Sequence, residues 1–104
     1  MRRGEVWWAE LPSPAGRRPV VLLSRNEAYD VRELVIVAPL TTRIRRIPTE
    51  VVLGSADGVP RRCVVNLDSL TTIPKQVLTR RLTTLAPEKL GAVERALRFA
   101  LGLV

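Results

Sequence analysis

Clusters of proline and glycine divide the chain into short apolar segments, and this punctuation constrains the fold more than any other feature. The segments PSPAGRRP at 12–19 and GSADGVP at 54–60 favour turns over a helix or a regular strand. The runs between them, such as VVLLS at 20–24 and LVIVAPL at 34–40, are rich in β-branched residues. The chain before Pro87 therefore predicts short strands joined by turns.

The spacing of apolar residues predicts the elements in more detail. We expect strands at 4–11, 20–24, 34–40, 49–53, 62–67, 69–73 and 77–85, with loops at 12–19, 41–48 and 54–60. Pro87 is suited to the first position of a helix, and Glu94 and Arg98 follow as an i, i+4 pair on its polar face. The apolar face of this helix is formed by Leu90, Val93, Leu97, Leu101 and Val104.

These elements predict a mainly β fold, namely a small SH3-like, partly open β-barrel with a C-terminal α-helix. The uninterrupted run VVLL indicates that both faces of its strand are covered, by a barrel or by a dimer interface. The helix then covers the open end of the barrel or contributes to a dimer contact. A length of 104 residues supports one domain, 1–104.

The charge of the chain points to a polyanionic partner. Lysine and arginine number 17 against 10 acidic residues, a net charge of +7, and 15 of the 17 are arginine. The arginine fork matches phosphate oxygens bidentately and can stack on a base. The alternative is an arginine-biased proteome, in which such a charge needs no nucleic acid to explain it.

Cysteine and histidine usage limits the chemistry. Cys63 is the only cysteine, so no disulfide can form within the chain, and we expect it to be a buried small hydrophobe. Without histidine, a conventional zinc site and the usual proton shuttle are missing, and we expect no metal and no cofactor. No apolar run approaches about 18 residues, so we expect a cytoplasmic protein that does not enter membranes.

Two segments carry candidate catalytic groups. Pro19 restricts Arg18 to an extended conformation at the start of a strand, which fixes the direction of its guanidinium. PLTTR at 39–43 offers two hydroxyls and a cation at the end of the next strand, all suited to a phosphate. Alternatively, Arg18 is a solvated rim charge and the threonines only cap a turn.

Taken together, six segments resemble the MazF/PemK-like toxins of type II toxin-antitoxin systems. They occur in that family's order and spacing over almost the whole chain: RGEVWWAEL, GRRPVVLLS, VIVAPLTT, PTEVVL, VVNLDSLTTIPKQVL and the closing helix. The resemblance implies a dimeric barrel of the CcdB/PemK/MazF-like kind that cleaves single-stranded RNA, often mRNA, without a metal. It also implies a cognate MazE-like antitoxin whose extended, acidic segment occupies the basic groove.

The resemblance assigns catalytic roles to Arg18 and Thr41. The implied reaction is attack of a ribose 2′-OH on the adjacent phosphate, which leaves a 2′,3′-cyclic phosphate and a 5′-OH end. Arg18 would stabilise the phosphorane and Thr41 would donate to a non-bridging oxygen. Flanking groups expected to bind RNA are Arg17, Thr42, Arg43, Asn66 and Asp68.

Two departures from the family pattern affect the substrate groove. The loop PSPAG before Arg17 is short and has no carboxylate, whereas many relatives have a Gly-Ser-Glu-type stretch there. The segment from Asp68 to Thr71 also lacks the Asp-Gln and the following basic residue that relatives often have. The cleavage sequence therefore cannot be transferred from the family.

The two tryptophans lie next to each other in the first predicted strand. Trp7 and Trp8 point to opposite sides of the first strand, where they serve core or dimer packing or, for one of them, stacking on an unpaired base.

Two alternatives to the nuclease remain: a toxin of the same fold that docks on DNA gyrase and cleaves nothing, and a basic SH3-like module that only binds nucleic acid.

Overall fold

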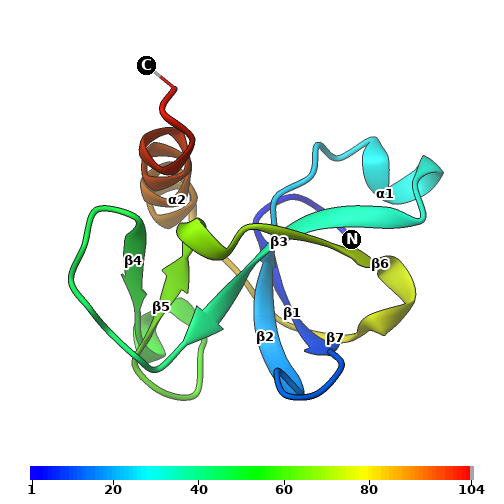
Figure 1. Ribbon diagram of the computed structural model, residues 1–104, viewed down its shortest axis with the longest axis horizontal. Helices are drawn as coiled ribbons and strands as arrows, with labels where there is room; N and C mark the ends of the chain where they lie inside the picture. The colour runs from blue at the N-terminus through cyan, green and yellow to red at the C-terminus, as the bar shows by residue number, and fades with distance from the viewer. Residues whose placement is uncertain (104) are drawn as a thin grey trace.

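The protein folds around one antiparallel sheet that does not close on itself (Figure 1). The structure, a computed structural model, describes residues 1–103. Along the sheet the strands are ordered β4-β5-β3-β2-β1-β7, and β6 pairs with the first half of β3. The strands are β1 (Glu5–Glu10), β2 (Arg17–Leu22), β3 (Leu34–Thr41), β4 (Glu50–Leu53), β5 (Cys63–Asn66), β6 (Thr71–Pro74) and β7 (Leu78–Thr84). This confirms the predicted mainly β, partly open architecture with a C-terminal helix.

Strand β3 joins the two parts of the sheet. Its residues Leu34 to Val37 pair with β6, whereas Leu40 and Thr41 pair with β5. In Figure 1, β1, β2, β6 and β7 lie on one side of the molecule and β4 and β5 on the other, with β3 crossing between them. The sheet therefore has two separately packed parts, and the ends of β2, β3 and β5 meet where these parts adjoin.

Each part of the sheet has its own apolar core. Val21 belongs to the core beneath helix α2, together with residues such as Val6, Leu53 and Val65. Val20 and Leu22 point to the opposite face and pack in the second core, formed with β3, β6 and β7. The run VVLL is continuous because both faces of β2 are buried, as its composition predicts.

Helix α2 (Pro87–Leu101) packs beside β4 and β5 (Figure 1). Pro87 occupies its first turn, as predicted, and Gly102 closes it with the positive φ of 70° that glycine adopts most readily. Val93 is fully buried and Leu97 is half-buried, whereas Leu101 is exposed; Val104 lies outside the described residues. No helix within residues 1–103 is long and apolar enough to cross a membrane.

Several local predictions are wrong. Strand β2 begins at Arg17, inside the segment predicted as a loop, because Arg17, Arg18 and Pro19 pair with β1. Four short elements were not predicted, because each spans too few residues to show a periodic pattern of apolar side chains. These are helix α1 (Ala28–Val31) and the 3₁₀ turns η1 (Ser55–Asp57), η2 (Leu67–Ser69) and η3 (Lys75–Val77). Glu94, expected to pair with Arg98, forms an ion pair with Arg3.

Candidate active site

The register of the strands brings Arg18, Thr41 and Asn66 to one face of the sheet. Val20 of β2 pairs with Pro39 of β3, so extending this antiparallel register by two residues sets Arg18 opposite Thr41. Leu40 pairs with Val65, which likewise sets Pro39 opposite Asn66. Residues opposite each other, and residues two apart on one strand, share a face of the sheet.

A cavity of about 200 Å³ forms at this face. Its walls come from β2, β3, β5 and the two segments that follow β3 and β5. The lining residues are Arg18, Pro39, Thr41, Arg43, Arg45, Asn66 and Ser69. Three arginines and three neutral polar residues thus line one small space, a composition that suits an oxyanion.

Arg18 is positioned by strand β2 and is half-buried. Its Nε is buried and makes no hydrogen bond to any of the described residues. A buried donor without a partner is costly, and in native proteins it usually has a functional or solvent explanation. Arg18 therefore brings to the cavity a guanidinium whose Nε–H is not bonded within the described residues.

The Thr41 hydroxyl lies at the last residue of β3. Its oxygen accepts the backbone N–H of Arg43 at 3.2 Å, as expected of a threonine that caps a turn. A hydroxyl that accepts one hydrogen bond keeps its own proton to donate. The capping role and a role as a donor to a bound phosphate are therefore compatible.

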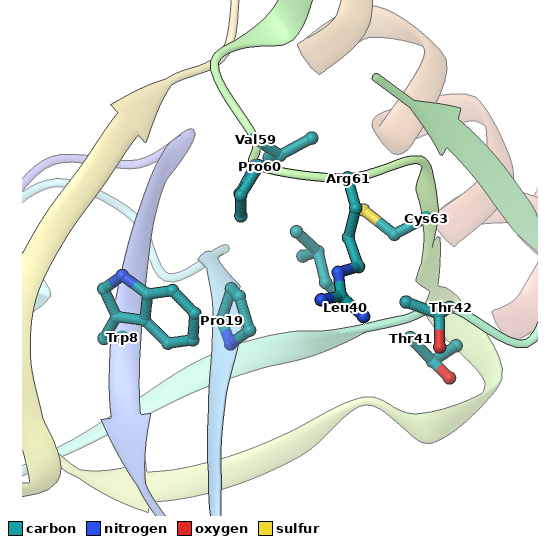
Figure 2. A pocket seen from close by; sticks show the side chains of 9 residues that line it. All are labelled: Trp8, Pro19, Leu40, Thr41, Thr42, Val59, Pro60, Arg61 and Cys63. Carbon is teal, nitrogen blue, oxygen red and sulfur yellow. The ribbon is translucent and has the colours of Figure 1, made fainter. Parts of the chain in front are cut away.

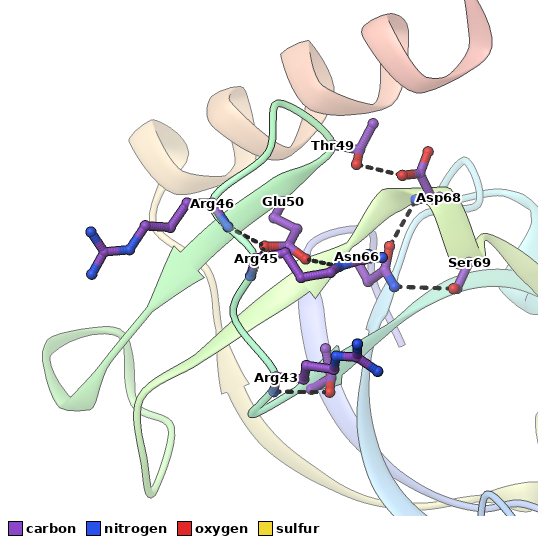
Figure 3. Close-up of polar contacts among 9 residues, drawn as sticks. Arg43, Arg45, Arg46, Thr49, Glu50, Asn66, Asp68 and Ser69 are labelled. Atoms are coloured by element: carbon purple, nitrogen blue, oxygen red, sulfur yellow. Dashed lines mark hydrogen bonds and ion pairs between the residues drawn. The ribbon is translucent and has the colours of Figure 1, made fainter.

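Glu50 fixes the loop that carries Arg43 and Arg45 (Figure 3). One carboxylate oxygen accepts the backbone N–H groups of Arg45 at 2.9 Å and Arg46 at 3.1 Å, and the other accepts Nε of Arg45 at 2.9 Å. Burial raises the pKa of Glu50, but these hydrogen bonds outweigh it, and the net pKa is below the ordinary value. Arg46 adopts a positive φ of 58° in the same turn, which the carboxylate stabilises.

Asn66 is held by its own neighbours at the end of β5. Its side-chain oxygen accepts the N–H of Asp68 at 3.0 Å, and its amide nitrogen donates to the Ser69 hydroxyl at 3.1 Å (Figure 3). Asp68 accepts the Thr49 hydroxyl at 2.5 Å. The segment after β5 is therefore ordered by side-chain caps, which orient Asn66 and Ser69 in the cavity.

The structure brings together only some of the residues proposed from the sequence. Arg18, Thr41, Arg43 and Asn66 line this cavity, whereas Arg17, Thr42 and Asp68 do not. Sequence reasoning missed Arg45 and Ser69 as lining residues and Glu50 as the residue that fixes Arg45. The arginine-rich segment RIRR was a signal for Arg45, but the pairing with Glu50, five residues later, depends on the conformation of the turn between them.

A second cavity, of about 260 Å³, adjoins the first (Figure 2). Its lining residues are Trp8, Pro19, Leu40, Thr41, Thr42, Val59, Pro60, Arg61 and Cys63. Cys63 is buried, as predicted, and burial followed by the charge of Asp57 raises the pKa of its thiol. A thiol that stays protonated is a poor nucleophile.

Arg17 and Trp8 contact each other at the edge of this second cavity. The Arg17 guanidinium lies 4.3 Å from the centroid of the Trp8 ring, and its Nε is 3.4 Å from a Glu10 carboxylate oxygen. Trp7 packs against the second core and donates from Nε1 to Glu5. The two tryptophans thus differ in use, with Trp7 in the core and Trp8 at a cavity.

The groups of the first cavity suit the stabilisation of a charged phosphate intermediate. Arginine donates two parallel hydrogen bonds to phosphate oxygens, and a nearby hydroxyl adds a third donor. Within residues 1–103, no three histidine, cysteine or acidic side chains are grouped so that they could hold a metal ion.

Comparison with known proteins gives a consistent result. Residues 2–101 match the family described as the PemK-like, MazF-like toxins of type II toxin-antitoxin systems. A probable endoribonuclease MazF5 of Mycobacterium tuberculosis is 48% identical over 99 residues, which cover 94% of this chain and 90% of the relative.

Solved structures show the same likeness. The Mycobacterium tuberculosis toxin MazF-mt6 superposes with a TM-score of 0.88 at 31% identity, over 96% of this chain and 98% of that one. An endoribonuclease from a mycobacterial species, solved in complex with its cognate antitoxin, has a TM-score of 0.87 at 30% identity, over 100% and 97% of the two chains.

Proposed function

The chain belongs to the PemK-like, MazF-like family of type II toxins, and we propose that it is an endoribonuclease that cuts single-stranded RNA. The observation that carries this proposal is the cavity in which Arg18, with its unpartnered Nε, lies across from Thr41. The two relatives named as endoribonucleases support the same activity. We assign residues 1–104 to a single toxin domain.

In the proposed reaction, the 2′-OH of one ribose attacks the adjacent phosphorus and the bond to the 5′ oxygen of the next nucleotide breaks. Arg18 stabilises the charge of the phosphorane, and Thr41 donates to a non-bridging oxygen. The products are a 2′,3′-cyclic phosphate and a 5′-OH end. No step requires a metal, since the cationic side chains of the cavity provide the charge stabilisation.

The proton of the 2′-OH is lost to water and the 5′ oxygen takes a proton from water, because no histidine or carboxylate is among the described residues that line the cavity. Arginine is protonated at any physiological pH, so Arg18 serves as an electrostatic group in this proposal and not as a base. The carboxylate that many relatives carry in the loop before Arg17 has no counterpart in PSPAG.

The remaining partners follow from the same family. We propose that a cognate antitoxin, like the one bound in the mycobacterial complex, inhibits this protein by covering the basic cavity with an acidic segment. We further propose that the toxin is a cytoplasmic homodimer. Exposed apolar side chains at Leu34 and Ile36 of β3 and at Val31 of helix α1 provide a surface for such a contact.

The test is cleavage of a long, mixed-sequence RNA by the purified protein in EDTA, with the ends mapped by primer extension. We expect discrete cuts whose 5′ ends accept phosphate from polynucleotide kinase without prior dephosphorylation. A short substrate with the mapped sequence and a single 2′-deoxy nucleotide before the scissile bond should stay intact. Cleavage of that deoxy substrate, or intact RNA at every enzyme concentration, would contradict the proposal; in the latter case a pull-down with gyrase comes next.

A further inference from the structure

The second cavity shares a wall with the first. Thr41 lines both, with Arg18 on one side and Trp8 and Pro19 on the other. Arg18 and Pro19 are consecutive in β2, so the two cavities lie next to each other along the same strand ends. A chain molecule with a phosphate in the first cavity can therefore reach the second cavity with a neighbouring group.

The walls of the second cavity are flat and largely apolar. Figure 2 shows Trp8 and Pro19 on one side of the space, with Val59 and Pro60 across from them and Leu40 at its base. The Arg17 guanidinium, 4.3 Å from the Trp8 ring, fixes the position of the indole. Flat apolar walls suit the face of a nucleobase, which stacks on aromatic side chains irrespective of sequence.

Arg61 adds a cation to this cavity. In Figure 2 its side chain extends from the segment after Pro60 towards Leu40 and Thr42. Arg61 forms no ion pair with any carboxylate among residues 1–103, unlike Arg3, Arg45 and Arg81. A cation without a carboxylate partner at an apolar cavity favours a ligand that combines a flat ring with negative charge.

The volume also limits the ligand. About 260 Å³ is below the ~300–1,000 Å³ typical of sites for drug-sized molecules, so the cavity suits one ring system. An apolar peptide side chain would fill the same walls but carries no charge of its own for Arg61, whereas every nucleobase of an RNA strand is accompanied by a phosphate.

We propose that this cavity binds one unpaired nucleobase of the RNA strand, next to the nucleotide whose phosphate Arg18 and Thr41 hold. Trp8 is the stacking wall, and Arg61 contacts the edge of the base or the phosphate that follows it. The proposal rests on the proposed function for its ligand. The base-binding cavity makes Trp8 and Arg61 determinants of the affinity for RNA next to the cleavage site.

The test uses RNA that cannot be cut. Fluorescein-labelled 2′-O-methyl octamers of A, C, G or U lack the attacking hydroxyl, and an abasic octamer carries the same phosphates without bases. By fluorescence anisotropy, at least one base-bearing octamer should bind about tenfold more tightly than the abasic one. Trp8→Leu and, independently, the exposed-residue variant Arg61→Ala should reduce this preference severalfold, whereas Trp8→Phe should retain most of it.

Arg62→Ala is the matched control for Arg61→Ala, because Arg62 is its exposed neighbour and does not line the cavity. It should weaken base-bearing and abasic octamers equally. Equal binding of abasic and base-bearing octamers by the native protein, or a preference that survives in both Trp8→Leu and Arg61→Ala, would overturn the proposal. Since no octamer can be cleaved, a failure of the nuclease assay would leave this measurement intact, and the two proposals fail separately.

Discussion

The cavity between β2 and β3 and the contact between the N-terminus and α2 use arginine in opposite ways. Arg3 is paired within the fold, because its Nε donates to the carbonyl of Leu23 at 3.3 Å and its Nη1 pairs with Glu94. Arg18 is also partly buried, but its Nε has no hydrogen-bond partner among the described residues. The difference indicates that a paired arginine stabilises the fold, whereas an unpaired one in a rigid strand is prepared for an external anion.

The largest effect is expected at Arg18. Arg18→Ala removes the main stabilising group for the phosphorane, so kcat for RNA cleavage should fall by about 10²–10³-fold. Single-turnover cleavage in EDTA measures this directly. Arg18→Lys keeps the charge but loses the bidentate fork, so it should recover only part of the rate.

The control for Arg18→Ala is the melting temperature. Because the Arg18 side chain makes no hydrogen bond from Nε within the described residues, its removal should leave thermal stability near that of the native protein. A large loss of stability together with an intact cleavage rate would show that Arg18 stabilises the fold, as Arg3 does, and does not act in the reaction.

Thr41→Val should have a smaller effect. The substitution keeps the β-branched shape of this strand residue and removes one neutral hydrogen-bond donor, so cleavage should fall by about tenfold. Thr84→Val is the matched comparison, because Thr84 is an exposed threonine of strand β7 that lines neither cavity. Equal losses in the two variants would contradict a specific role for the Thr41 hydroxyl in the reaction.

Glu50→Gln tests the loop that carries Arg43 and Arg45. Glutamine keeps one acceptor for the backbone N–H groups but loses the charge that holds the Arg45 guanidinium, so KM for RNA should rise about threefold. Glu88→Gln, on the exposed first turn of α2, is the control.

The lowered pKa of Glu50 also sets a pH dependence. A carboxylate whose pKa is lower in the folded state stabilises it fully above the ordinary value of 4.5, and that contribution is lost as the pH falls through the lower folded value. The ion pair between Glu50 and Arg45 should therefore stay intact between pH 7 and about pH 5, and it should cause no rise in the KM of the native protein over that range. A rise in KM that Glu50→Gln abolishes within that range would contradict the assignment.

The smallest effect is expected at Arg3, on the other side of the comparison. Arg3→Ala breaks a partly exposed ion pair and should lower the free energy of unfolding by about 1 kcal/mol, or the melting temperature by about 4 °C. The cleavage rate at a temperature well below melting should not change. A rate loss as large as that of Arg18→Ala would remove the distinction between the two regions.

Much of the fold follows from the sequence, because the strands and the long helix have clear periods. The burial of both faces of β2 was predictable from the run VVLL, and the start of α2 from Pro87. The start of β2 was not predictable, since Arg17, Arg18 and Pro19 are turn-like by composition and become a strand only by pairing with Trp8 and its neighbours.

The candidate site follows from the sequence only in part. The local motifs of Arg18 and Thr41 suggest phosphate binding, and the family resemblance assigns their catalytic roles. Their placement across from each other depends on the register between β2 and β3. The sequence did not show that Arg45 lines the cavity and that Asp68 does not. Arg45 lines the cavity while its Nε donates to Glu50, and Asp68 instead accepts a hydrogen bond from Thr49, a residue 19 positions away in the chain.

The most direct test of the account is an NMR titration of the arginine Nε–H groups with an uncleavable 2′-O-methyl RNA oligonucleotide. We expect the Nε–H resonance of Arg18 to shift downfield and to become protected from exchange with water, because a phosphate oxygen provides its missing acceptor. The Nε–H of Arg3, already bonded to Leu23, should not move. An unchanged Arg18 resonance at saturating RNA would contradict the central claim that this arginine binds the phosphate.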